Sequence, residues 1–363
     1  MLIVRYGEIA LKHKNRRRFE KKLTNDILNV LKKNGFESRV KLLWGRILVY
    51  TSNKALEIVK KIPGIVSVSV AEEMEYECVK PFLLKELRKY EPESFRVSTH
   101  RVDKSFSKTS MDIDREIGAF VVENFGWKVD LKDPDLIVGI EIIDGKAYVF
   151  FEKVKGIGGL PSGSQGRLIA LVSSGIDSPV ATFMMLKRGV DVIVMHFYQT
   201  LREKKLVEEI VRILNEYSVK DLELISIDHH ESMNPIVSAL DEIKRVEWTC
   251  LICKVNMLKT AEKIAKEKGA LGIIMGDSLG QVASQTLTNL YIESSVVDIP
   301  IYRPLIGLDK EEIIEVAKKI GTFNVFMKNP NAACAFRPNR VVTQGKLEEF
   351  KRIMKKLEEK KIF

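Results

Sequence analysis

The order of hydrophobic and polar positions divides the chain into two parts. In the first part, short alternating runs such as residues 2–6 and 46–51 predict strands, and the amphipathic stretch from Asn15 to Gly35 predicts a helix. In the second part the apolar runs are continuous, as in residues 167–172 and 190–197, and helical patterns follow them. Such runs indicate a parallel sheet covered on both faces. The first part is typical of small α+β layers.

A segment rich in Gly and Ser, residues 156–167, separates these parts and predicts a linker. A chain of 363 residues is long enough for two or three domains, each with its own core. The hydrophobic fraction of 45% excludes a disordered protein. No run approaches the length of a membrane-spanning helix, so we expect no membrane association.

The charge of the chain suits a polyanionic partner. Lys and Arg number 59 against 49 Asp and Glu, which gives a net charge of +10. The same excess would also fit an organism whose proteins are generally basic. Four cysteines are too few for a disulfide scaffold, and we therefore expect a reducing, cytoplasmic location.

The clearest candidate site lies where the predicted strand 167–172 runs into the loop 173–178, with Pro179 at the start of a helix. A turn rich in Ser and Gly at a helix start presents backbone N–H groups and hydroxyls, which suits phosphate. The carboxyl end of a strand is also where open α/β sheets bind ligands. No Gly-Lys-Ser/Thr follows, so the loop is not a Walker A motif. An ordinary serine-capped turn is the alternative.

The loop and its surroundings, LVSSGIDSPVA, closely resemble the S-G-G-x-D-S motif of the PP-loop ATP pyrophosphatases. This resemblance implies ATP as cofactor and assigns catalytic roles to Asp177 and Ser178. Asp177 would orient Mg²⁺ on the phosphates or cap the helix. The first glycine of the motif is Ser174 here, and a serine fits the tight loop if its φ is negative.

Four further segments are similar to the tRNA 4-thiouridine synthetase family: RYGEIALKHKNRRRFEKKL, VKGIGGLPSGSQG, GDSLGQVASQTLTNL and RPLIGLDKEEII. The matches extend over nearly the whole chain. The resemblance implies an N-terminal ferredoxin-like domain (1–54), a THUMP RNA-binding domain (55–155), the linker and a PP-loop α/β domain (168–363). It implies that the enzyme adenylates the uridine at tRNA position 8 and replaces its 4-carbonyl oxygen with sulfur, releasing AMP and pyrophosphate.

By the same resemblance, ten residues fall at the nucleotide positions of the family: Leu171, Val172, Ser173, Ser174, Gly175, His196, Phe197, Lys254, Gly276 and Gln285. The backbone at the ends of adjacent strands would read adenine, and Lys254 would hold negative charge. His196 has the alternative role of a histidine satisfied at a strand end, and Gln285 that of a helix-surface residue. Asp277, Arg303 and Lys310 are additional candidates.

Three cysteines, Cys250, Cys253 and Cys334, form a second candidate site. Three thiolates would leave one corner of an iron–sulfur cluster without a protein ligand. Tetrahedral zinc would need a fourth ligand, for which His229 and His230 are candidates. Buried cysteines without a metal are the third reading.

The family resemblance favours the cluster. The chain ends at Phe363 without the rhodanese domain of many bacterial members, and its C-x-x-C pair resembles the archaeal-type members. In those, three cysteines hold an iron–sulfur cluster whose open iron would bind hydrosulfide. The rival donor is a persulfide carrier acting through Cys334, resolved by Cys250 or Cys253. Cys78 lies outside this group, and we interpret it as structural.

Basic runs mark the candidate tRNA-binding surface. Residues 11–22 contain seven Lys or Arg and one acid, and a solvated face of this kind binds phosphate backbones through counterion release. The candidates are Lys12, Lys14, Arg16, Arg17, Arg101 and Lys104. We also consider a homodimer, because one tRNA could bridge two subunits. The competing functions are a PP-loop tRNA thiolase acting on another base, and a non-catalytic RNA-binding protein whose loop has decayed at Ser174.

Overall fold

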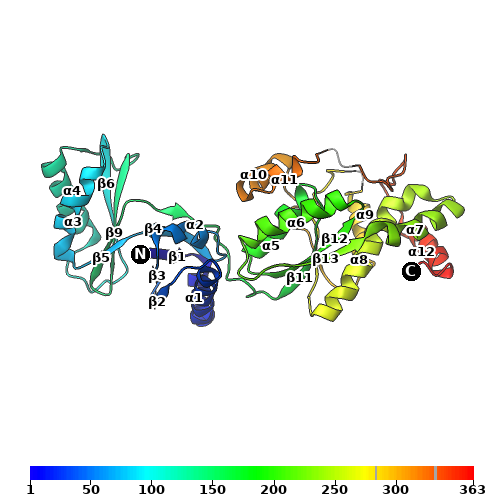
Figure 1. Cartoon of the computed structure of the whole chain (residues 1–363), viewed down its shortest axis with the longest axis horizontal. Helices are drawn as coiled ribbons and strands as arrows, with labels where there is room; N and C mark the ends of the chain where they lie inside the picture. Colours follow the sequence, from blue (N-terminus) through cyan, green and yellow to red (C-terminus); the bar gives the residue numbers. More distant parts are fainter. Residues whose placement is uncertain (283, 331–332) are drawn as a thin grey trace. The chain divides into compact units, whose positions relative to one another are not determined.

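The computed structural model describes residues 1–282, 284–330 and 333–363 (Figure 1). Residues 283 and 331–332, which belong to the GDSLGQVASQTLTNL segment and to the segment before Cys334, lie outside the described residues. The chain forms two compact units, Met1–Pro161 and Ser162–Phe363, which divide within the Gly- and Ser-rich segment. In the described part of the chain, no helix is long and apolar enough to cross a bilayer.

The first unit contains two sheets of five strands each. The first sheet has the order β10-β4-β1-β3-β2 and pairs antiparallel throughout. Its strands are β1 (Leu2–Tyr6), β2 (Arg39–Leu43), β3 (Arg46–Tyr50), β4 (Ile65–Val70) and β10 (Val154–Lys155). Helix α1 (Arg16–Lys33) turns Leu23, Ile27 and Leu31 into the core, as its spacing predicts, and the short helix α2 (Leu56–Val59) follows β3.

The second sheet of this unit has the order β5-β9-β8-β6-β7. Its strands are β5 (Glu72–Met74), β6 (Ser94–Arg101), β7 (Lys128–Val129), β8 (Leu136–Ile143) and β9 (Lys146–Phe150), with helices α3 (Val79–Glu86) and α4 (Ser110–Phe125). A capping box formed by Thr109 and Asp112 begins α4, and Gly126 with a φ of 70° ends it. Ile113, Ile117 and Val121 of α4 pack on Phe95 and Val138 of the sheet.

The first sheet reaches beyond the expected domain limit at residue 54. Strands β4 and β10 pair with each other and join this sheet, although residues 65–70 and 154–155 fall in the segment 55–155 that we assigned to the second domain. The chain therefore leaves the first sheet after β4, builds the second sheet, and returns through β10. No Gly- or Ser-rich segment marks this exchange, because it depends on strand pairing between residues far apart in sequence.

The second unit is built on a five-stranded parallel sheet with the order β13-β12-β11-β14-β15. Its strands are β11 (Arg167–Leu171), β12 (Asp191–Tyr198), β13 (Glu223–Asp228), β14 (Ile273–Ile274) and β15 (Ile301–Tyr302). The order reverses direction beside β11, which creates the crevice where parallel sheets bind ligands. The predicted α/β fold class, with a parallel sheet preceded by two small α+β layers, is confirmed.

Helices cover both faces of this sheet. Helices α5 (Asp177–Lys187) and α6 (Leu201–Asn215) lie on the opposite side from α8 (Thr249–Lys268) (Figure 1). Leu258 and Ala261 of α8 pack on Ile169 and Met195 of the sheet. The remaining helices are α7 (His229–Glu242), α9 (Leu287–Ser294), α10 (Lys310–Ile320), α11 (Phe323–Phe326) and α12 (Leu347–Glu359).

A buried carboxylate links the two sheets of the first unit. Glu141 of β8 accepts hydrogen bonds from Nε of Arg5 at 2.6 Å and Nε of Arg46 at 2.5 Å, which come from β1 and β3. Burial opposes the charged carboxylate, but the two guanidinium groups outweigh it and lower the pKa of Glu141. Arg5 also donates to Ser69 of β4. One carboxylate of the second sheet is thus the counter-charge shared by two arginines of the first.

We predict that Glu141→Ala loosens the first unit, because the substitution leaves Arg5 buried without its counter-charge. Breaking one partner of a buried pair costs about 3–5 kcal/mol. Hydrogen exchange in the full chain should show this loss as faster exchange of β1, β3 and β8. The matched control is Glu72→Ala, which removes an exposed carboxylate from β5. Equal exchange rates in the two variants would contradict the assignment.

Candidate active site

The serine-rich loop between β11 and α5 is closed by its own hydroxyl groups. The backbone N–H of Ser173 donates to Oγ of Ser178 at 2.9 Å, and the N–H of Gly175 donates to Oγ of Ser173 at 3.3 Å. Ser174 is not among the residues with positive φ, so it meets the condition set for a serine at this position. The loop therefore retains a compact strand-to-helix turn despite the missing glycine.

Gly276 lies directly against the start of α5. A Cβ atom built on Gly276 would lie 2.7 Å from both N and Cα of Ser178 and 3.0 Å from the carbonyl carbon of Asp177. Real Cβ atoms do not approach backbone atoms this closely, so only glycine fits here without displacing the loop. Gly276, from the segment that follows β14, thus sets the distance between that segment and the loop after β11.

Asp177 is the first residue of α5 but does not cap it, since the helix start has no side-chain capping bond. Its carboxylate instead accepts hydrogen bonds from Nζ of Lys310 at 2.7 Å and from Nε2 of Gln281 at 2.9 Å. Of the two roles predicted for Asp177, helix capping is therefore not seen. Lys310, which was predicted only as an additional candidate, contacts Asp177 at the loop.

His196 is held by the backbone of the neighbouring strand end. Its Nδ1 lies 2.9 Å from the carbonyl oxygen of Val172, and the N–H of Val172 donates to Met195. Both backbone groups of Val172 are therefore engaged within the sheet. Burial lowers the pKa of His196, and its buried Nε2 has no hydrogen-bond partner among the described residues. Phe197, the next residue, meets the ring of His229 edge to face.

A buried ion network lies behind the loop. Nζ of Lys254 on α8 is 3.1 Å from Oδ1 of Asp277 and 3.0 Å from Oε1 of Glu293, and Arg303 pairs with the same two carboxylates. Burial disfavours the ammonium, but Asp277 and Glu293 outweigh it and raise the pKa of Lys254. Gln285 is buried and donates to Asp277, so it is not a helix-surface residue.

The three cysteines come together at the next strand ends. Cys250 and Cys253 lie in the first two turns of α8, and Sγ of Cys253 is 3.2 Å from Nε2 of His229. Burial, followed by the charge of Cys334, raises the pKa of Cys250. Burial, then Cys334 and Cys250, raises the pKa of Cys253 to about 12. The segment of Cys334 reaches the same region, because the ring of Phe336 packs on the His229 ring that contacts Cys253.

Gln199 fixes the segment that carries Cys334. Its Nε2 lies 3.3 Å from Sγ of Cys334, and its Oε1 accepts the N–H of Ala335 at 2.8 Å. The ring of Phe336 packs on His229 and His230. Sequence reasoning missed Gln199, because no local pattern indicates that the residue following β12 meets a segment 135 positions away.

The sulfur atoms of the three cysteines are ligands of the kind that soft metals prefer. The pKa values of Cys250 and Cys253 are raised, so a bound cation would be needed for both to become thiolates together. Among the described residues, no three His, Cys, Asp or Glu side chains are already arranged to hold a metal ion. Cys78 is exposed near the start of α3, within the first unit.

The predicted RNA-binding residues differ in their exposure and in their contacts with other side chains. Lys14 and Arg17 are exposed and have no ion-pair partner within the described part of the chain. Arg16 is bound to Glu20 at 2.7 Å and to the hydroxyl of Tyr6 at 3.0 Å.

The other three basic candidates also differ in their contacts. Lys12 lies over the ring of Phe19, and Lys104 is exposed. Nη1 of Arg101 donates to the carbonyl oxygens of Phe106 and Lys108 and so ties down the segment before α4.

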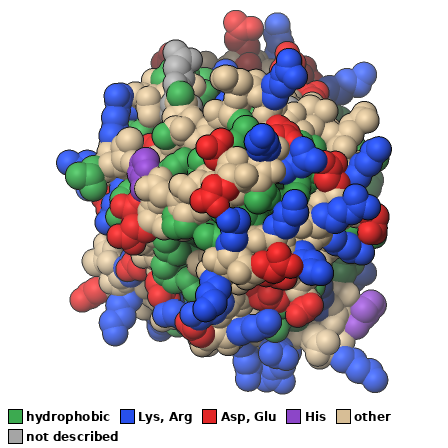
Figure 2. Space-filling view, turned by 90° about the vertical axis from the view of Figure 1, so that its right-hand side faces the viewer, with side chains coloured by type: hydrophobic (Ala, Val, Ile, Leu, Met, Phe, Trp, Pro, Cys, Tyr) green, Lys and Arg blue, Asp and Glu red, His purple; other side chains and the backbone are tan. Residues whose placement is uncertain are grey.

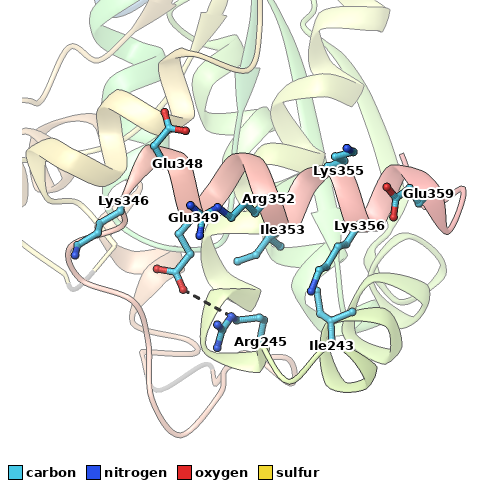
Figure 3. A pocket seen from close by; sticks show the side chains of 10 residues that line it. All are labelled: Ile243, Arg245, Lys346, Glu348, Glu349, Arg352, Ile353, Lys355, Lys356 and Glu359. Carbon is cyan, nitrogen blue, oxygen red and sulfur yellow. Dashed lines mark ion pairs between the residues drawn. The ribbon is translucent and has the colours of Figure 1, made fainter.

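A separate hollow of about 730 Å³ lies beside α12 (Figure 3). Its lining is mostly charged: Ile243, Arg245, Lys346, Glu348, Glu349, Arg352, Ile353, Lys355, Lys356 and Glu359. Figure 2 shows that basic and acidic side chains alternate over the face it draws. No loop or thiol residue lines this hollow, so it is not part of the candidate active site.

Comparisons with known proteins give the family. The model of the family described as "Thiamine biosynthesis protein (ThiI)" matches residues 163–359, its ferredoxin-like domain matches 1–69, and the THUMP domain matches 74–152. The chain belongs to the ThiI family. "Probable tRNA sulfurtransferase" of Thermococcus kodakarensis is 43% identical, and the match covers 97% of this chain and 96% of that protein. The protein of the same name from Methanocaldococcus jannaschii is 41% identical, with 98% of this chain and 97% of that protein covered.

Solved structures of ThiI relatives share the fold. A 4-thiouridine synthetase, crystallised with RNA and bound ATP, has a TM-score of 0.86 and 33% identity, covering 99% of this chain and 94% of that one. PH1313 from Pyrococcus horikoshii has a TM-score of 0.70 and 30% identity, covering 88% and 99%.

We predict that the thiols differ in reactivity once any metal has been removed with a chelator. Exposed Cys334 and Cys78 should be alkylated rapidly at about pH 8, whereas Cys253 should react slowly, because each pH unit below its pKa lowers the thiolate tenfold. Mass spectrometry of iodoacetamide-treated protein over a pH series measures the rates. Alkylation of Cys253 as fast as that of Cys78 would contradict the raised pKa of Cys253.

Proposed function

We propose that the chain is an ATP-dependent tRNA sulfurtransferase that converts the 4-carbonyl of the uridine at tRNA position 8 to a thiocarbonyl. One observation carries the proposal: the serine-rich loop and the thiols are attached to the same edge of one parallel sheet. The loop follows β11, Gln199 with its contact to Cys334 follows β12, and His229 with its contact to Cys253 follows β13. Carboxyl ends of parallel strands meet at one edge.

This arrangement fits a two-step substitution. A uracil carbonyl oxygen is a poor leaving group. Attack of that oxygen on the α-phosphate of ATP releases pyrophosphate and joins the oxygen to AMP. A sulfur nucleophile then attacks the same carbon, AMP leaves with the oxygen, and loss of the sulfur-bound proton gives the thiocarbonyl. Both steps need nucleotide and sulfur close to one base, since a bound geometry replaces a collision between separate reactants.

The loop residues supply binding and orientation in this scheme. N–H groups and hydroxyls of Ser173–Ser178 at the start of α5 suit the phosphates of ATP. Asp177 would orient Mg²⁺, and Lys310 beside it supplies positive charge close to the phosphates. The intact turn at Ser174 and the ATP-bound relative both speak against a decayed loop.

The direct test is thiolation of tRNA by the full chain with ATP and sulfide under anaerobic conditions. Mass spectrometry of the digested tRNA should find one sulfur at uridine 8. Gly276→Ala should lower ATP-dependent pyrophosphate release roughly 5- to 150-fold, because overpacking against Ser178 costs about 1–3 kcal/mol.

Gly307→Ala is the matched control, since a Cβ at Gly307 meets nothing within 4 Å. It should release pyrophosphate like the wild type. Sulfur found on another base would exclude position 8, and absence of any tRNA-dependent pyrophosphate release would exclude the function.

The three cysteines, in this proposal, hold an iron–sulfur cluster. A cluster with one iron free of protein ligands would bind hydrosulfide and hold it near the activated base. The support is the convergence of Cys250, Cys253 and Cys334 and the raised pKa values of the first two, which a bound cation would reverse. His229, whose Nε2 contacts Sγ of Cys253, is placed to orient that cysteine or to serve as the fourth ligand of a zinc site.

We predict that anaerobically purified protein contains iron and acid-labile sulfide, and that Cys250→Ala loses both. Elemental analysis and sulfide release measure them, with Cys78→Ala as the control that keeps the wild-type content. Zinc without sulfide would make the site structural. Protein free of metal would leave Cys334 as a persulfide carrier, with Cys250 or Cys253 forming the resolving disulfide.

Two further expectations accompany this function. We propose a cytoplasmic location, where thiols stay reduced and tRNA is available. A homodimer remains a prediction, and light scattering with and without tRNA would detect it.

A further inference from the structure

A tryptophan stands exposed at the tip of the β2–β3 hairpin. Leu43 pairs with Arg46, so Trp44 and Gly45 form a two-residue turn, and Gly45 takes a φ of +74° that few other residues adopt. Trp44 is 72% exposed. The other two tryptophans, Trp127 and Trp248, are half-buried and buried. An exposed tryptophan offers a large, flat aromatic face to a partner.

One neighbour of the indole ring is already defined. The guanidinium carbon of Arg16 lies 4.6 Å from the ring centroid of Trp44. Arg16 is itself fixed by Glu20 and the hydroxyl of Tyr6, which hold it at the start of α1. The ring therefore rests on a stationary cation, while most of its surface stays open to solvent. A flat, supported aromatic face is what a stacking ligand requires.

Basic residues without ion-pair partners among the described residues lie close to the ring of Trp44. Arg16 contacts Trp44 and begins α1, and Lys14, Arg17 and Arg18 next to it are exposed and have no ion-pair partner among the described residues. Cations beside an aromatic face match a ligand that combines phosphate with a planar base. A peptide partner would need no such excess of one sign.

We propose that Trp44 is a stacking site for an unpaired nucleobase of the RNA substrate, with Arg16 supporting the ring and the basic residues at the start of α1 binding the adjoining phosphates. This inference rests on the proposed function, because it assigns an additional contact with the same tRNA. Stacking is tolerant of base identity, so the site contributes affinity and register, and the chemistry at uridine 8 remains with the second unit.

The test separates stacking from charge. Trp44→Ala and Trp44→Leu should each weaken binding of tRNA to the full chain about ten- to a hundredfold, whereas Trp44→Phe should retain most of the affinity. The slope of log affinity against log salt should be unchanged in all three, because stacking releases no counterions. Arg17→Gln, the matched control, should lower that slope by about 0.9. Tryptophan fluorescence of the wild type should be quenched by tRNA, and Trp44→Phe should abolish that quenching.

Several outcomes would overturn the proposal. Wild-type affinity of Trp44→Ala, or equal affinity of Trp44→Leu and Trp44→Phe, would exclude aromatic stacking. A change in the sedimentation of RNA-free Trp44→Ala, without loss of tRNA affinity, would make the surface a contact between copies of the chain. If the wild type binds and thiolates tRNA in these assays, such results overturn only the Trp44 site. If the wild type does neither, the proposed function fails.

Discussion

The ammonium of Lys254 is buried between two carboxylates, and the arrangement of the candidate active site depends on that contact. Lys254 lies one turn beyond Cys250 on α8, Asp277 follows Gly276 after β14, and Glu293 lies on α9. Buried charges are tolerated only with their partners in place, so these three elements hold a fixed relation. The helix that carries two thiols is thereby tied to the segment that presses on the phosphate loop.

The same contact changes the interpretation of individual residues. From sequence, Lys254 and Gln285 were predicted to bind the nucleotide, but in the structure both make their side-chain contacts with Asp277. The direct contact with nucleotide that the sequence predicts for these two residues stays a prediction. Lys310 is different, because it pairs with Asp177 at the loop itself and remains partly exposed. It is therefore better placed to meet phosphate than Lys254.

Local patterns predicted the elements of the fold and the loop, but not the long-range pairings. The strand 167–172, the turn at Ser173–Ser178 and the helix after it are contiguous, and hydrophobic periodicity with turn chemistry identifies them. The return of residues 154–155 to the first sheet and the clamp of Gln199 on Cys334 join distant parts of the chain. A single sequence has no period or spacing that encodes such contacts. Whether Arg16 and Arg101 are available to bind RNA likewise depends on their contacts with other parts of the chain, which local sequence does not show.

In the proposed reaction, nucleotide and sulfur act in turn on one carbonyl group of the bound tRNA. Oxygen-18 placed at the 4-carbonyl of uridine 8 follows the leaving oxygen directly. We expect the label to appear in the phosphate of AMP, in an amount equal to that of the thiolated uridine formed. Label that remains in the tRNA, or that is released into water while AMP stays unlabelled, would contradict it.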